Sequence, residues 1–169
     1  IPKDACLVNF MKVSDDTLLA LCLGNDTDVQ AANIPVSKDF FDKCQLYHEL
    51  NAYADINALH SDGKYLWQLA DGTYKISLGR TPPDDSATAI NNSEKWLALR
   101  KNLAEELSRK LIQPVEQFVS ASAHWIISPD AELNIVPFET LLYRGKMLIE
   151  SVDVSYVPSL AVLNLMKKR

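Results

Sequence analysis

The stretch HWIISPDAELNIVPFETLL, residues 124–142, constrains the fold more than any other part of the sequence. Its first five residues are bulky and include adjacent isoleucines, which is typical of a buried central strand. Pro129-Asp130 is ordinary turn chemistry, and LNIV predicts a second extended piece after the turn. Pro137 stands at the favoured first position of a short helix that begins FETLL. A strand that leads through turns into a helix indicates an α/β domain.

A long helix is predicted before this stretch. Asn91 and Glu94 resemble a capping pair, and Pro114 breaks or kinks the helix before one further turn, VEQFV. The apolar stripe of this helix advances by three or four residues: Trp96, Leu99, Leu103, Leu107 and Leu111. The charged residues between them indicate a solvated side rather than a binding surface: Lys95, Lys101, Glu105, Glu106 and Arg109.

Two β-hairpins and a helix are predicted before residue 91. ACLVNFMKV and TLLALCLG surround a turn at Asp15-Asp16, and KYLWQLADGTYKISLG places Asp71-Gly72 in a type I′ turn. Ser37 can cap a helix that covers the sheet, with apolar residues at helical spacing: Phe40, Phe41, Cys44, Tyr47 and Leu50.

The remaining segments are a loop, an extended piece and a final helix. RTPPDDSATAINN, residues 80–92, has two adjacent prolines and no periodicity, so it predicts a loop. KMLIESVDVSYV predicts extended chain, and PSLAVLNLMKKR predicts a helix capped by Ser159.

Composition excludes several classes of partner. The 169 residues are 47% hydrophobic and 23% charged, which suits one soluble domain with a sizeable core. A net charge of -5 argues against nucleic acid, because lysines and arginines must neutralise phosphates. The apolar runs are shorter than the roughly 20 residues that a bilayer span requires, so we expect no membrane partner.

The three cysteines form an odd set without a C-x-x-C pair, so the sequence favours neither a zinc site nor a disulfide framework. If Asp15-Asp16 forms the first turn, Cys6 and Cys22 point to opposite faces of the hairpin, which disfavours a disulfide between them. A reducing compartment follows, and we expect the protein to be cytoplasmic.

Few residues of the sequence are candidates for catalysis or metal binding. Cys44 and His48 lie four apart on a predicted helix and could pair as thiolate and base or as metal ligands, but a core cysteine beside a surface histidine is the favoured interpretation. His124 is interpreted as a structural histidine at a strand edge, and His60 as a loop residue. The three tryptophans are predicted to be core residues: Trp67, Trp96 and Trp125.

Asp130 and Glu132 could act as a carboxylate pair in acid–base work, but turn chemistry is the simpler interpretation. Glycine-rich phosphate loops are absent from the sequence. We therefore assign no catalytic, cofactor-binding or metal-ligating residue to this chain, and we expect no cofactor.

Four short motifs in order resemble the first half of the CHAT domain, a caspase-like family often fused to tetratricopeptide repeats. They are Pro114 at a helix end, Pro129-Asp130, Val136-Pro137-Phe138-Glu139 and Tyr156-Val157-Pro158-Ser159. The sequence departs from the family at Ala131 and Glu132, where a glycine is common in the turn, and in an apparent insertion around residues 55–90.

The resemblance implies a caspase-like layered α/β sheet with flanking helices, preceded by N-terminal β-hairpins. Residues 1–90 would hold the hairpins and one helix, and residues 91–169 the first helix, strands and helix of the core, in one continuous but incomplete domain. The start at Ile1 and the end at Arg169 favour a piece of a longer protein.

For the intact family domain, the resemblance implies peptide-bond cleavage by a cysteine nucleophile with a histidine base, both downstream of the Tyr-Val-Pro-Ser motif. Two functions remain open for this chain: structural support for the missing catalytic half of a cysteine peptidase, or a non-catalytic protein-interaction module. The expected partners are the remainder of the same polypeptide and a protein or peptide. A half-sheet should also expose an unpaired edge or an apolar patch.

Overall fold

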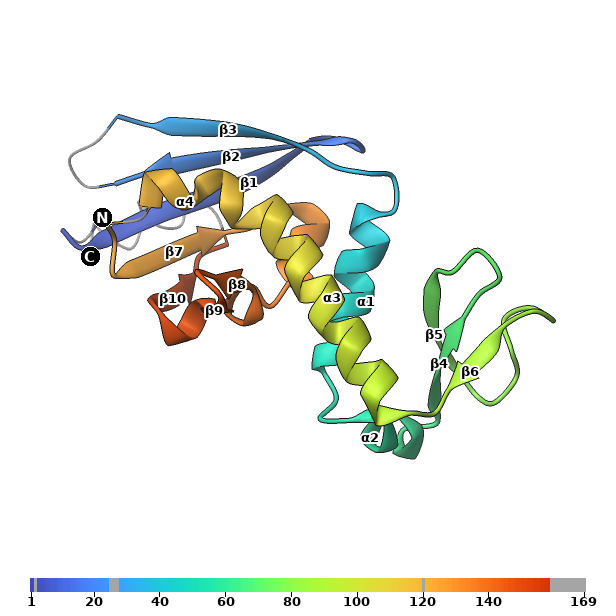
Figure 1. Ribbon diagram of the computed structural model, residues 1–169. Coiled ribbons are helices and arrows are strands. Elements are labelled where there is room, and N and C mark those ends of the chain that lie inside the picture. Colours follow the sequence, from blue (N-terminus) through green and yellow to red (C-terminus); the bar gives the residue numbers. More distant parts are fainter. Residues whose placement is uncertain (2, 25–27, 120, 159–169) are drawn as a thin grey trace.

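The protein has a mixed α/β fold, which confirms the predicted fold class and is compatible with an incomplete caspase-like domain (Figure 1). The computed structural model describes residues 1, 3–24, 28–119 and 121–158. Three sheets occur within these residues, with five, three and two strands. The helices α3 and α1 lie between the five-stranded and three-stranded sheets (Figure 1).

The five-stranded sheet has the order β10-β7-β1-β2-β3. Its strands are β1 (Ala5–Ser14), β2 (Thr17–Leu23), β3 (Gln30–Pro35), β7 (His124–Ser128) and β10 (Asp153–Tyr156). β7 is parallel to both β1 and β10, whereas β1, β2 and β3 are antiparallel. The predicted central strand HWIIS is therefore confirmed, because β7 is buried and has a neighbour on each side.

The first hairpin is confirmed, but its predicted register is wrong. Ser14 pairs with Thr17 around the Asp15-Asp16 turn, yet Lys12 pairs with Leu18, so Val13 is an extra residue in β1. Such a bulge shifts the register by one residue and reverses which side chains share a face.

Because of this bulge, Cys22 pairs with Val8 and lies on the same face as Cys6, not on the opposite face as predicted. Both cysteines are buried in one cluster, and both are free thiols. The expectation that they form no disulfide is confirmed, although the geometric reason for it was wrong.

The second hairpin joins β4 (Lys64–Gln68) and β5 (Tyr74–Leu78), as predicted. Its turn is not type I′, because Gly72 has φ +83 while Asp71 is not among the positive-φ residues. The amide of Gly72 donates to the carbonyl of Leu69, and the amide of Leu69 donates to that of Thr73. This pattern is a three-residue loop with a left-handed glycine at its end.

The predicted loop at 80–92 contains a short strand, β6 (Thr88–Ile90), which pairs with β4 and completes the three-stranded sheet. The helix that follows begins one residue later than predicted, because its N-cap is not Asn91. The N-cap is Asn92, whose side-chain oxygen accepts from the amides of Glu94 and Lys95.

Four α-helices occur in the described residues: α1 (Phe40–Asn51), α2 (Ile56–Ser61), α3 (Ser93–Leu111) and α4 (Gln113–Val119). The predicted positions of α1 and α3 and the break before Pro114 are confirmed. Ser37 does not cap α1 with its side chain, because the N-cap is Asp39. The main neighbours of α1 are the 3₁₀ helix η1 (Ala131–Ile135), α3 and β5, so α1 lies beside α3.

The segment after β7 is not extended as predicted. The first three residues of LNIV fall in a 3₁₀ helix, η1 (Ala131–Ile135), because the Asp130 side chain accepts from the Ala131 amide and starts a tight turn, whereas Val136 is the extended C-cap. Pro137 precedes one 3₁₀ turn, η2 (Phe138–Thr140). The segment 146–157 is only partly extended, with β9 (Lys146–Met147) pairing with β8 (Leu142–Tyr143) and η3 (Leu148–Glu150) preceding β10. The predicted helix at Ser159 lies outside the described residues.

One hydrophobic cluster joins the helices to one face of the five-stranded sheet and to the three-stranded sheet. All three tryptophans are buried, as predicted, and Trp96 and Trp125 are fully enclosed. The other face of the large sheet carries a smaller cluster of buried residues: Ala5, Leu7, Ile126 and Val157.

The packing of α3 gives a stability prediction. Leu107→Ala should lower the free energy of unfolding by about 2–5 kcal/mol, because Leu107 is fully buried and its loss leaves a cavity. Leu97→Ala on the same helix is the control, because Leu97 is 57% exposed and its loss should cost below about 0.5 kcal/mol. Urea unfolding followed by circular dichroism measures both; equal losses would show that the burial of α3 is wrongly described.

Candidate functional site

Cys44 and His48 do not form a pair. Cys44 is fully buried inside the core, whereas His48, one turn further along α1, is exposed to solvent. Burial raises the pKa of the Cys44 thiol to about 12, which disfavours the nucleophilic thiolate. The predicted core cysteine beside a surface histidine is therefore confirmed.

His124 is a structural histidine, as predicted. It begins β7, and its Nε2 lies 2.8 Å from the hydroxyl of Ser155 on β10. His60 lies in α2, not in a loop, and its ring stacks on Tyr65 with a centroid distance of 4.7 Å. Because Tyr65 lies in β4, this ring contact helps to pack α2 on the three-stranded sheet.

Asp130 and Glu132 serve turn structure rather than acid–base chemistry. Asp130 caps η1, and Glu132 accepts from the ammonium of Lys12 at 2.9 Å. The hydrogen bond from Lys12 lowers the pKa of Glu132, which opposes a role as a proton donor. The backbone of Ala131 has φ +48, the left-handed region that favours glycine, so the departure from the family pattern falls where a glycine would be least strained.

The described residues contain no group of three or more histidine, cysteine or carboxylate side chains that could hold a metal ion. None of their helices has the length and apolar composition needed to cross a bilayer.

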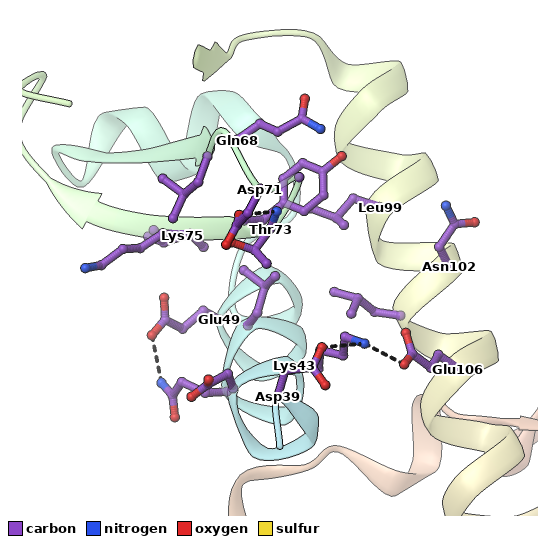
Figure 2. A pocket seen from close by; sticks show the side chains of 18 of the residues that line it. Asp39, Lys43, Glu49, Gln68, Asp71, Thr73, Lys75, Leu99, Asn102 and Glu106 are labelled. Atoms are coloured by element: carbon purple, nitrogen blue, oxygen red, sulfur yellow. Dashed lines mark hydrogen bonds and ion pairs between the residues drawn. The ribbon is translucent and has the colours of Figure 1, made fainter. Parts of the chain in front are cut away.

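A groove that the sequence did not predict lies between α1, α3 and the β4–β5 hairpin, with a volume of about 1030 Å³ (Figure 2). Apolar side chains from three elements line it: Leu46 of α1, Leu99 and Leu103 of α3, and Tyr74 and Ile76 of β5. Its charged side chains are Asp39, Asp42, Lys43, Glu49, Asp71, Lys75, Lys95 and Glu106. Lys95 and Glu106 were expected on a purely solvated side of α3, so that interpretation of these two residues is incomplete.

An ion-pair bridge closes one end of this groove. The ammonium of Lys43 lies 2.8 Å from Asp39 and 2.7 Å from Glu106, so it joins α1 to α3 (Figure 2). The hydrogen bond from Lys43 lowers the pKa of the Asp39 carboxyl. Asp42 and Glu49 form none of the ion pairs seen in the described part of the chain.

The described residues form an α/β domain in which β1, β7 and β10 are parallel. The central strand β7 follows the helices α3 and α4 and is followed by the 3₁₀ turns η1 and η2, which lie next to Pro129 and Pro137. The family model of the CHAT domain matches residues 101–169, from the second half of α3 to the end of the chain. The resemblance to the CHAT domain stated from the motifs is therefore confirmed for this segment.

Other comparisons add little. No curated protein matches this chain. Among solved structures, it is similar to diol dehydratase-reactivating factor in its nucleotide-free form, with 13% identity and a TM-score of 0.32. The match covers 77% of this chain and 25% of that chain, so our chain spans about a quarter of that protein's length.

Thiol chemistry tests the burial of the cysteines. Burial raises the pKa of Cys6 to about 11 and those of Cys22 and Cys44 to about 12. We expect a disulfide reagent at pH 8 to modify none of the three in the native protein and all three in denaturant, because thiolates are the reactive form. A fast-reacting thiol in the native state, located by mass spectrometry, would contradict this account of the site.

Proposed function

We propose that this chain is the N-terminal portion of a CHAT-type cysteine peptidase domain and that it supports a catalytic half supplied by the remainder of the polypeptide. The match of the CHAT family to residues 101–169 carries this proposal. Cleavage of a peptide bond by a thiol needs a thiolate, an imidazole that accepts and returns its proton, and donors for the oxyanion. The three cysteines of this chain are buried, so they do not meet the first of these needs.

The open edge of the large sheet supports the same proposal. Within the described residues, β10 pairs only with β7, so its outer side has no strand partner. The amides of Asp153 and Val157 donate to the β7 side, and by alternation those of Val154 and Tyr156 face outward. Three partly exposed apolar residues lie in or just before this edge: Met147, Ile149 and Tyr156. An open edge beside apolar surface is a natural place for further chain to dock.

In this proposal, the chain contributes to catalysis by position. β1, β7 and β10 would set the plane on which downstream strands carry the histidine and the cysteine. Tyr156 donates a hydrogen bond to Glu139, which ties the edge strand to η2 in the Val-Pro-Phe-Glu motif. This bond would hold the edge strand in a fixed place for its next partner.

Two further attributes belong to the proposal. The acidic net charge supports protein or peptide partners over nucleic acid, and we propose no membrane partner. Three free cysteines support a reducing, cytoplasmic setting.

The alternative function is a non-catalytic interaction module that retains the caspase-like half for docking. The groove between α1, α3 and β5 favours this alternative, because it is large and has no role in the peptidase proposal. The two functions differ in the residues expected downstream of Arg169. A peptidase requires a histidine-glycine loop and an alanine-cysteine strand end there, whereas an interaction module does not.

The decisive assay uses the intact polypeptide. We expect replacement of the downstream alanine-cysteine thiol by alanine to abolish hydrolysis of a mixed peptide library, whereas alanine at the buried Cys44 changes activity only through stability. Absence of both downstream motifs, or full activity without that thiol, would reject the peptidase proposal.

Hydrogen exchange tests the docking edge separately. The outward amides of Val154 and Tyr156 should exchange at least tenfold faster in this chain alone than in the intact polypeptide, because a new neighbouring strand would bond to them. The amide of Val157, which already donates to Ile127, is the internal control. Equal exchange of the outward amides in both proteins would place the remainder elsewhere.

A further inference from the structure

The groove has an unpaired strand as one of its walls. Within the described residues, β5 is the edge of the three-stranded sheet and pairs only with β4. Four consecutive residues around its start line the groove: Thr73, Tyr74, Lys75 and Ile76 (Figure 2). The backbone of this strand is therefore part of the groove surface.

The hydrogen-bond pattern of the hairpin shows which backbone groups are free. The amide of Leu69 donates to the carbonyl of Thr73 at one end, and the amide of Gly79 donates to that of Gly63 at the other. Facing residues in an antiparallel pair alternate between bonded and non-bonded positions. The amides and carbonyls of three β5 residues therefore face away from β4: Tyr74, Ile76 and Leu78.

The side chains of the groove add an apolar floor and an acidic rim. Leu46, Leu99 and Leu103 come from the two helices opposite the strand. Five acidic and three basic residues line the groove. One of these three, Lys43, is already held between Asp39 and Glu106, so it offers little positive charge to a ligand.

Asp42 and Glu49 of α1 form an acidic part of the rim that is available to a ligand. Asp42 is exposed, and Glu49 accepts a hydrogen bond from the Gln45 amide but forms no ion pair within the described chain. Carboxylates beside an apolar floor attract a cationic side chain whose stem can lie on the floor.

We propose that this groove binds an extended segment of a partner protein in which apolar residues alternate with lysine or arginine. The segment adds to β5 as a new edge strand, and its backbone bonds to the outward groups of Tyr74, Ile76 and Leu78. Successive side chains of a strand point to opposite sides, so one alternate set faces the groove. Lysine or arginine side chains in that set lay their stems on the apolar floor and direct their charged ends to Asp42 and Glu49, which flank Leu46 on the same face of α1. A helical ligand would leave the edge of β5 unpaired, which is why the segment is extended.

This inference goes beyond the peptidase proposal and does not depend on it. It concerns α1, α3 and β5, whereas the peptidase proposal concerns the β10 edge. Binding at the groove is expected whether or not the intact protein cleaves peptides.

The test uses a fluorescently labelled eight-residue peptide in which valine and lysine alternate, with the 169-residue chain as receptor. We expect saturable binding by fluorescence anisotropy and at least tenfold slower exchange of the Tyr74, Ile76 and Leu78 amides in the complex. The double variant Asp42→Lys, Glu49→Lys should bind at least tenfold more weakly.

The matched control is the double variant Asp62→Lys, Asp85→Lys, which changes net charge equally at exposed positions outside the groove. It should bind within twofold of the unaltered chain. Circular dichroism and thermal unfolding verify that each variant is folded, and an unfolded groove variant is replaced by Asp42→Asn, Glu49→Gln, for which at least threefold weaker binding is expected.

Three results would overturn the inference. They are no saturable binding of the peptide, equal weakening in the groove and control variants, and protection of amides elsewhere without protection of those on β5. Equal weakening would mean that the peptide follows the net negative charge rather than the groove.

Discussion

The parallel pairing of β1 with β7 is the interaction on which the rest of the structure depends. It joins residues more than a hundred positions apart in sequence, from Ala5 with His124 to Asn9 with Ser128. Trp125 and Ile127 enter the main core through this pairing, while Ile126 enters the smaller cluster on the other face. Each buried side chain of this size contributes roughly 1.5–3 kcal/mol, which offsets the entropy of closing so long a loop. β10 then has a strand to pair with, and the sheet can extend.

The chain between β1 and β7 fills the space that this pairing creates. The apolar stripe of α3, from Trp96 to Leu111, runs through the core. It joins the three-stranded sheet to the five-stranded sheet in one hydrophobic cluster. Ser108 is buried on this helix, and its hydroxyl accepts from the amide of Leu142 at 2.6 Å, which fixes β8 against α3. The same arrangement leaves the groove open where α1 and α3 diverge from β5 (Figure 2). The helices α1 and α3 therefore contribute both to the core and to the walls of the groove.

The sequence predicted elements whose signal is local and strong. Period and composition were enough for α3, for the buried strand at Trp125 and for both hairpins. Prediction failed where one residue or a distant neighbour decides the outcome. The bulge at Val13 reverses the faces of a whole strand, and nothing in the residues around it indicates an extra residue. LNIV is typical of extended chain by composition, but the cap supplied by Asp130 tightens it into a 3₁₀ turn. β6 forms only because β4 offers an edge.

The candidate sites follow the same division. The interpretation of Cys44 as a core residue needed only its place in a helical stripe, so the sequence was sufficient. The groove needs the distance between two helices and the edge of a strand, none of which a pattern of residues contains. The CHAT motifs, in contrast, were readable because they lie largely within one continuous segment, 101–169.

A structure of the polypeptide extended past Arg169 tests the central claim most directly. The account predicts a further strand bonded to the outward backbone groups of Val154 and Tyr156, continuing the large sheet beyond β10, with a reactive thiol on that continuation. A downstream region folded as a separate domain, with the β10 edge still open to water, would contradict it.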